Sequence, residues 1–149
     1  MNISSVSDSE ILEEYVRRFT IPAGAPIKSA RMAADHFRAF FADAAKHEKF
    51  VVCYLNGQSQ LLTTEIAAVG SLSTSAVYPR EIVSRVIELG ANSVLFAHNH
   101  PSGSTTPSNS DRAVTKKLQT GLNAIDVEVQ DHIIVGGSEH FSFADHHLL

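Results

Sequence analysis

The chain has 149 residues, of which 44% are hydrophobic and 19% charged, with a formal net charge of −4. This length corresponds to about one domain, which can form a core without disulfides. The single cysteine, Cys53, excludes a disulfide scaffold and a cysteine-based zinc cluster. No apolar run is long enough to span a membrane, and residues 1–5 do not resemble a signal peptide, so we expect a cytoplasmic protein. The slightly acidic balance argues against strong nonspecific phosphate binding.

The N-terminal part of the chain is expected to be helical. Ser7 and Glu10 have the spacing of a capping box, which predicts a short helix over about 8–18. Residues 21–26 contain two prolines and a glycine and are the best candidate for a linker. We therefore expect a short helix and linker over 1–26 and the main domain over 27–149.

Ser29 can cap a second helix, in which apolar residues recur at helical spacing. Such a stripe is typical of a helix packed on a core. Its members are Met32, Ala33, Phe37, Phe40, Phe41 and Ala44.

Two hairpins, two further helices and a central strand follow. The apolar run 50–55 predicts a buried strand, and Asn56 and Gly57 predict the turn to a partner strand over 61–69. Pro79 suits the first position of a helix that ends at Gly90. The apolar face of this helix is expected to contain Ile82, Val83, Val86 and Ile87.

Residues 93–98 predict a second buried strand, followed by a polar loop and a helix over about 108–122 that Gly121 and Asn123 close. A last hairpin is expected over 127–135 and 140–143, with its turn at Gly136 and Gly137. This order predicts an α/β domain of three layers, with helices on both faces of a mixed central sheet.

The segment after the second buried strand contains the residues with metal-binding character. His98 and His100 are two apart at the end of this strand, so both imidazoles project to the same side. Asp111 lies in the first turn of the following helix, from which its carboxylate can return to the same edge. Three protein ligands with a fourth position left for water are the pattern of a catalytic zinc site.

Simpler interpretations exist for the same residues. A single histidine here is more often an ordinary hydrogen-bonded residue. Ser108 and Asp111 also have the spacing of a helix cap, with the acid near the positive end of the helix dipole. The two interpretations are compatible, since a capped helix start would hold both side chains rigidly.

The whole segment also fits a family motif. His98, His100 and Pro101, then six residues, Ser108, two residues and Asp111 resemble the JAMM zinc-hydrolase pattern at every position. The form of the motif is similar to that of the RadC family, a bacterial branch of the JAMM/MPN superfamily. Segments 47–52, 77–81, 131–136 and 141–143 also resemble that family, so that the similarity covers about 27 to 147. It implies the cytidine-deaminase-like architecture of JAMM/MPN domains.

The resemblance also implies roles for individual residues. One zinc ion would be bound by His98, His100 and Asp111, with a water in the open position whose pKa zinc can lower toward neutrality. A glutamate outside the motif would accept the proton of this water. Glu48 occupies the position where the family has it, before the first strand. Glu65 and Glu81 are the alternatives, and Glu81 is also explained as a first-turn acid.

Ser108, by the same resemblance, would donate a hydrogen bond to the oxyanion of a tetrahedral intermediate. His132 matches a family position, which indicates either a place near the site or a structural histidine on an edge strand. Cys53 is most simply a small core residue. The remaining histidines have no partner at metal-ligand spacing: His36, His47, His140, His146 and His147.

Two other metal-enzyme classes are excluded. The consecutive residues His98, Asn99 and His100 do not by themselves indicate an HNH nuclease. A zinc deaminase requires a glutamate at the position of His100 and a nearby cysteine pair, which this sequence lacks. The function expected is a zinc-dependent hydrolase of a peptide or isopeptide amide. The alternative is an accessory protein of DNA repair or recombination in which the metal is mainly structural. DNA binding has weak support, because basic residues occur singly or in pairs.

Overall fold

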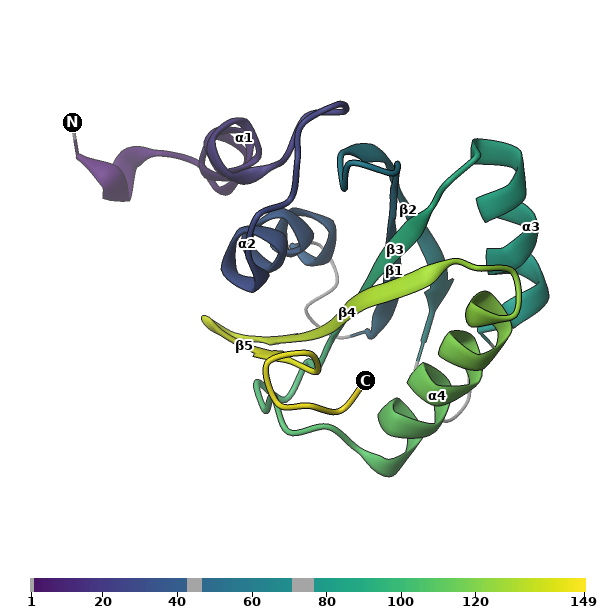
Figure 1. The fold of residues 1–149 in the computed structure, drawn as a ribbon. Helices are drawn as coiled ribbons and strands as arrows, with labels where there is room; N and C mark the ends of the chain where they lie inside the picture. Colours follow the sequence, from purple (N-terminus) through teal and green to yellow (C-terminus); the bar gives the residue numbers. More distant parts are fainter. Residues whose placement is uncertain (1, 43–46, 71–76) are drawn as a thin grey trace.

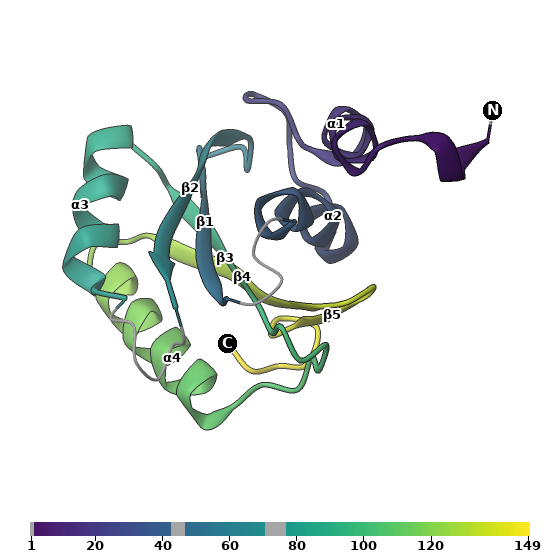
Figure 2. The same cartoon turned by 180° about the vertical axis from the view of Figure 1, so that it is seen from behind.

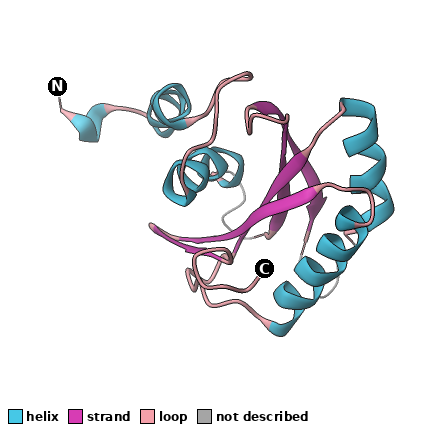
Figure 3. Cartoon of the chain, viewed as in Figure 1, coloured by secondary structure: helices cyan, strands magenta, loops and turns pink. Residues whose placement is uncertain are grey.

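The computed structural model describes residues 2–42, 47–70 and 77–149 (Figure 1). Figure 3 distinguishes its helices, strands and loops. In chain order the elements are η1 (Ile3–Ser5), α1 (Asp8–Phe19), α2 (Ala30–Phe41), β1 (Lys49–Leu55), β2 (Leu61–Val69), α3 (Pro79–Leu89), β3 (Ser93–Asn99), α4 (Asn109–Asn123), β4 (Glu128–Gly136) and β5 (Glu139–Ser142).

The five strands form one mixed sheet in the order β2-β1-β3-β4-β5. β3 and β4 are parallel, whereas the other neighbouring pairs are antiparallel. A parallel pair needs a crossover connection, which α4 provides between β3 and β4. α2 covers one face of the sheet, and α3 and α4 cover the other (Figures 1 and 2). The predicted three-layer α/β fold is therefore confirmed.

The central strands are apolar throughout because helices cover both of their faces. In β1, Phe50 and Val52 pack toward α3 and α4, whereas Val51 and Cys53 pack toward α2. Cys53 is a buried core residue, as expected, and burial raises the pKa of its thiol to about 12. Side chains of β3 that follow the same alternation reach the α4 layer at Phe96 and, two residues later, at His98.

Most of the predicted ends of the helices are confirmed. Ser7 forms the capping box with Glu10, and the Ser29 hydroxyl accepts a hydrogen bond from Met32 N. Pro79 begins α3, and Gly90 ends it in the left-handed conformation with φ 67°. Such a backbone angle favours glycine, because a Cβ atom is strained there.

Three local expectations were wrong. Ile87 is 68% exposed, so the apolar face of α3 consists of Ile82, Val86 and the partly buried Val83. Gly121 lies inside α4 rather than at its end. A Cβ added at Gly121 would lie 3.5 Å from Pro79 at the start of α3. The last turn begins at Gly137, because Gly136 is still part of β4. Ala44, expected on the α2 stripe, lies outside the described residues.

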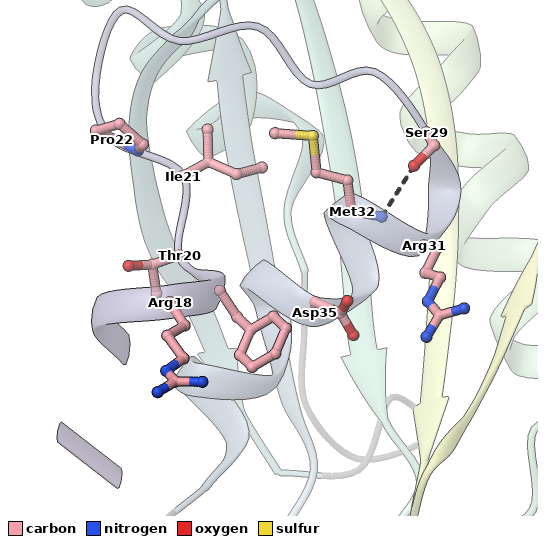
Figure 4. A pocket seen from close by; sticks show the side chains of 9 residues that line it. Arg18, Thr20, Ile21, Pro22, Ser29, Arg31, Met32 and Asp35 are labelled. Atoms are coloured by element: carbon pink, nitrogen blue, oxygen red, sulfur yellow. Dashed lines mark hydrogen bonds between the residues drawn. The ribbon is translucent and has the colours of Figure 1, made fainter. Parts of the chain in front are cut away.

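The N-terminal helix lies at the side of the domain. α1 packs on α2 and leaves apolar side chains such as Ile11 and Val16 exposed. The segment expected as a linker lies against the start of β2, where Gly24 N donates to Leu61 O at 2.8 Å. A surface hollow between the end of α1 and the start of α2 lies on the α2 side of the sheet (Figure 4). In the described part of the chain, no helix has the length and apolarity that a membrane crossing needs.

His36 ties α2 to two other segments. Its Nδ1 accepts a hydrogen bond from Ile21 N at 2.8 Å, and its Nε2 lies 2.8 Å from Thr64 Oγ1 in β2. Its side chain is buried, and this burial lowers the pKa of His36 to about 4 from 6.5. Unfolding therefore releases a neutral imidazole into water, where it takes up a proton more readily.

This shift predicts a pH-dependent contribution of His36 to stability. Because its pKa is lower in the folded chain, the unfolded chain binds more protons between about pH 6.5 and pH 4. The stabilising contribution is complete above this window and is lost as the pH falls through it. Between about pH 7 and pH 5, the free energy of unfolding of wild type should fall by about 1–2 kcal/mol more than that of His36→Gln. Denaturant unfolding at the two pH values measures this difference. Equal losses in the two proteins would contradict the prediction.

Candidate metal centre

The three predicted metal ligands meet at the carboxyl end of β3. His98 Nε2 lies 2.9 Å from His100 Nε2 and 3.1 Å from Asp111 Oδ1. His100 Nε2 lies 3.1 Å from Asp111 Oδ2. In the described part of the chain this His-His-Asp group (His98, His100 and Asp111) is the cluster with metal-binding geometry. Residues that lie up to thirteen positions apart in the sequence thus present three ligand atoms to one point.

The loop after β3 places His100 next to His98. His100 N donates to Val135 O at 2.9 Å, which continues the pairing with β4 one residue past the strand. The chain then turns, with Gly103 N donating to His100 O at 3.0 Å and Gly103 at φ 86°. The carbonyl of Ser104 accepts a hydrogen bond from His100 Nδ1 at 2.9 Å. Since a carbonyl oxygen only accepts, the proton of neutral His100 lies on Nδ1 and Nε2 keeps its lone pair.

The first turn of α4 holds Asp111 through a capping box. Ser108 N donates to Asp111 Oδ2 at 2.8 Å, and Asp111 N donates to Ser108 Oγ at 3.0 Å. The same carboxylate therefore caps the helix and faces both histidines, so a helix cap and a metal ligand are compatible at this position. The positive end of the helix dipole stabilises the negative charge at this position.

The electrostatics of the group favour a shared cation. Burial alone would raise the pKa of Asp111, but hydrogen bonds to His100 and His98 outweigh it and hold this pKa far below its usual range. The hydrogen bond to Asp111 is also the main cause that raises the pKa of His100. His98 and Asp111 are almost completely buried, whereas 13% of the His100 side chain is exposed. A carboxylate in such surroundings needs a positive partner.

The dimensions of the group fit a zinc ion. Zinc bonds nitrogen and oxygen at about 2.0–2.1 Å, so ligand atoms on a tetrahedral ion lie about 3.3 Å apart. The three separations of 2.9, 3.1 and 3.1 Å are within a few tenths of an ångström of this spacing. Two imidazole nitrogens and one carboxylate also form a donor set that suits zinc and leaves one position for another ligand.

Glu48 lies immediately before β1, on the same side of the sheet as the His-His-Asp group. β1 and β3 are antiparallel with Phe50 opposite His98, so two more residues of this register set Glu48 opposite His100. Residues opposite one another in antiparallel strands share a face. The negative charge of Glu48 contributes to the raised pKa of His100, which agrees with this proximity.

The backbone around Glu48 is held from two sides. Gly70 N, after β2, donates to Glu48 O at 2.7 Å. On the other side, the Asn99 amide donates to His47 O at 3.0 Å and accepts from Lys49 N at 2.7 Å. Asn99 is the middle residue of the His-Asn-His sequence, and sequence reasoning assigned it no part. Its side chain points to the other face from the histidines because side chains alternate along β3.

The two alternative glutamates have different surroundings. Glu65 lies in β2 opposite Val52 and forms a two-pronged ion pair with Arg85 of α3, at 2.8 and 2.7 Å. Glu81 is exposed in the first turn of α3 and lines the same hollow as Glu65 and Arg85. The structure thus brings Glu48 toward the metal ligands, whereas Glu65 and Glu81 belong to the β2–α3 side of the domain.

Ser108 is exposed at the start of α4. Its Oγ accepts the hydrogen bond from Asp111 N, so its own hydroxyl proton is available to another acceptor.

His132 is in direct contact with a predicted ligand. Its Nε2 lies 2.7 Å from His98 Nδ1, and its side chain is completely buried. The alternative of an edge-strand histidine was wrong, because β4 pairs with β3 on one side and β5 on the other. Burial is the main cause that lowers the pKa of His132 well below 6.5. The signal in the sequence was the place of His132 as the second residue of segment 131–136, which resembles the RadC family.

The other histidines are not part of this group. His36 lies on the opposite face of the sheet, in the α2 layer. His146 stacks on Phe141 at 4.0 Å between ring centroids, and its Nδ1 lies 2.8 Å from Ser142 O. In the part of the chain that the structure describes, His47, His140 and His147 also lie outside the metal-binding cluster.

The fold and the site together define the class of the protein: an α/β domain of the JAB (JAMM/MPN) type with a candidate metal group at the end of its central strand. Residues 27–148 match the RadC-like JAB domain family. UPF0758 protein YfjY of Escherichia coli (strain K12) is 40% identical over 139 residues, which are 93% of this chain and 84% of that protein. The chain belongs to the RadC family.

Two further relatives from the same organism agree. UPF0758 protein YeeS is 46% identical over 104 residues, 70% of each chain. UPF0758 protein YkfG is 41% identical over 126 residues, 85% of this chain and 79% of that protein. These similarities identify the family, and their names state no activity.

The contact between Gly136 and the metal-site loop predicts a selective effect of one methyl group. A Cβ at Gly136 would lie 2.5 Å from Gly103 O and 2.9 Å from Ser104 O, so the loop would have to move. We expect Gly136→Ala to destabilise the fold by about 1–3 kcal/mol and to weaken zinc binding, because Ser104 O orients His100.

The neighbouring glycine provides the matched control for this variant. Gly137 has φ 58° and nothing within 4 Å of its Cβ position, so Gly137→Ala adds backbone strain alone. Its cost should be about 1 kcal/mol without a change in zinc affinity. Denaturant unfolding and a zinc titration against a chelator measure both quantities. Equal zinc affinity in Gly136→Ala and wild type would refute the role of the loop.

Proposed function

We propose that this protein is a zinc-dependent hydrolase that cleaves a peptide or isopeptide amide. The observation that carries the proposal is the meeting of His98, His100 and Asp111 at 2.9–3.1 Å. Glu48 precedes by two residues Phe50, which pairs with His98, and its negative charge contributes to the raised pKa of His100. The group supplies three ligands and leaves a fourth position, which is the arrangement of catalytic rather than structural zinc sites. Membership of the RadC-like JAB domain family supports the same chemistry.

A bound zinc ion supplies Lewis acidity, which makes water a competent nucleophile near neutral pH. In the proposed reaction, Glu48 accepts one proton from the attacking water and returns it to the leaving amine. The C–O bond forms first and gives a tetrahedral intermediate, and the C–N bond then breaks, so that one amide and one water give one carboxylic acid and one amine. The Ser108 hydroxyl donates a hydrogen bond to the oxyanion that develops on the carbonyl oxygen.

The exposure of the residues sets the direction of substrate approach. His98 and Asp111 are buried, whereas His100 is partly exposed and Glu48 is half-buried. The loop residues Pro101 to Ser104 beside His100 are exposed as well. A carbonyl group therefore reaches the site from the side of His100, between Glu48 and the exposed Ser108.

The hydrogen bonds around Glu48 support its role as the proton carrier. A general base must keep its carboxylate within hydrogen-bond reach of the water. The Asn99 side chain is hydrogen-bonded to the backbone of both residues that flank Glu48. Asn99 itself lies between the candidate ligands His98 and His100 in the sequence. The position of the carboxylate is thus linked to the same strand that presents the metal ligands.

The accessory role in DNA repair receives less support from the charge distribution. Several arginines form ion pairs with neighbouring acids: Arg17 and Arg18 share Glu14, Arg38 pairs with Asp35, and Arg85 pairs with Glu65 and Glu88. Nonspecific DNA binding depends on clustered cations that can face phosphates. A DNA-bound form of the protein would require a partner or a surface other than these pairs.

Zinc should stabilise the fold through the His-His-Asp group. At a free zinc concentration of about 100 times Kd, the free energy of unfolding should rise by about 2.7 kcal/mol. Asp111→Asn keeps an oxygen that can accept from Ser108 N but removes the charge, so most of this stabilisation should disappear. His147→Ala, which changes an exposed histidine, is the control and should respond like wild type. The measurement is Tm as a function of zinc concentration. If His147→Ala lost the rise in Tm while Asp111→Asn kept it, the assignment of Asp111 as a ligand would be excluded.

Glu48→Gln should separate metal binding from chemistry. Zinc content should stay at one per chain, whereas kcat on a panel of fluorogenic peptide amides and isopeptide-linked lysine peptides should fall at least about 100-fold. Glu65→Gln, which breaks the pair with Arg85, should keep the activity of wild type.

Two outcomes would contradict this assignment. Activity that depends on Glu65 rather than Glu48 would move the proton carrier to β2. Wild type that binds zinc, hydrolyses no member of the panel and binds duplex DNA at physiological salt would favour the accessory role instead.

A further inference from the structure

We propose that His132 and Thr115 are positioning residues that keep His98 in the tautomer able to bind a metal ion through Nε2. This inference rests on the proposed function, because it takes His98 as a ligand. It adds two residues, one in β4 and one in α4, that do not belong to the ligand set.

A continuous chain of hydrogen bonds leads from His98 to the backbone of Asp111. His98 Nδ1 lies 2.7 Å from His132 Nε2, and His132 Nδ1 lies 2.5 Å from Thr115 Oγ1. Thr115 Oγ1 lies 2.7 Å from the carbonyl oxygen of Asp111. All four residues are buried, with at most 2% of each residue exposed. Buried polar groups of this kind satisfy one another, so each proton can be assigned.

The direction of this hydrogen-bond chain follows from the group at its end, the carbonyl of Asp111. The Asp111 carbonyl can only accept, so the single hydroxyl proton of Thr115 points to it. Thr115 Oγ1 then offers lone pairs to His132, whose proton must lie on Nδ1. The Nε2 atom of neutral His132 is consequently an acceptor and receives the proton of His98 Nδ1. His98 Nε2 is left with its lone pair directed at the metal position.

The surroundings of His132 favour the neutral ring that this assignment needs. Its imidazole stacks on Phe143 at 4.7 Å and meets Phe50 and Phe96 edge-on at 5.6 and 6.1 Å between centroids. A charged ring enclosed by three apolar rings would be expensive in free energy. The aromatic cage also fixes the ring plane, so that Nε2 stays aligned with His98.

His98 and His100 therefore receive the same tautomer by different means. The partly exposed His100 donates from Nδ1 to a backbone carbonyl, that of Ser104. The fully buried His98 depends on side chains from two other elements, β4 and α4. Because the hydrogen-bond chain ends at the carbonyl of Asp111, it links the candidate ligands His98 and Asp111 through two residues behind the site.

The reverse direction of the chain is the competing arrangement. Thr115 would then donate to His132 Nδ1, and His132 Nε2 would donate to His98 Nδ1. The proton of neutral His98 would lie on Nε2, in the position of the metal. The two arrangements differ in the tautomer of His132, which can be measured directly.

Substitutions that retain shape but remove hydrogen bonds test the contribution to metal binding. His132→Phe places a fourth apolar ring in the aromatic cage, and Thr115→Val replaces a hydroxyl by a methyl group. We expect zinc affinity, measured by chelator competition, to fall about 10- to 100-fold in both variants and to return with Thr115→Ser. His36→Gln, which alters a buried histidine on the other face of the sheet, should bind zinc like wild type.

These measurements distinguish the inference from the proposed function. Wild type that binds no zinc would overturn both the ligand assignment and the inference that depends on it. Wild type that binds zinc with the same affinity as folded His132→Phe and Thr115→Val would overturn the inference alone. Circular dichroism and unfolding without zinc establish that each variant is folded.

Nitrogen-15 NMR of the imidazole rings gives a readout that needs no variant. Already in the zinc-free protein, and unchanged after zinc is added, we expect His132 to carry its proton on Nδ1, with an unprotonated Nε2. A His132 protonated on Nε2 would reverse the chain and refute the proposal, even if a variant failed to fold.

Discussion

The site depends on the position of β3 between an antiparallel neighbour and a parallel one. Antiparallel β1 begins where β3 ends, so the residue before β1, Glu48, arrives beside His100. Parallel β4 runs with β3 and contributes His132 behind His98. A parallel pair also requires a crossover, and the crossover helix α4 begins at the same end of the sheet with Asp111 in its first turn. One arrangement of three strands thus assembles the candidate ligands and their support.

The start of α4 combines a structural and a chemical demand in one carboxylate. Asp111 completes the capping box with Ser108 and also faces the two histidine nitrogens. The helix dipole and the imidazoles both favour its charged form, which outweighs the effect of burial on its pKa. The ligand geometry is therefore largely formed by the fold, and a bound cation would stabilise the same state that the hydrogen bonds stabilise.

The residues behind the ligands separate into two supporting groups on opposite faces of β3. Asn99 points to the α2 side and holds the backbone on both sides of Glu48. His132 and Thr115 lie on the α4 side and contact His98 and the Asp111 backbone. Because side chains alternate along a strand, His98 and His100 face the candidate metal position, whereas Asn99 between them supports the backbone around Glu48.

The sequence by itself determined the elements, the three-layer class and the ligand candidates. Caps, turns and strand alternation depend on residues close together in the chain, so Ser7, Pro79 and the His-x-His spacing could be interpreted directly. Local patterns were insufficient where distant segments compete: Ile87 proved exposed, and His132 lay on an inner strand rather than an edge. Only the tertiary structure decided which glutamate approaches His100 and what stands behind His98. Strand order and register arise from packing between segments tens of residues apart, and no local spacing encodes them.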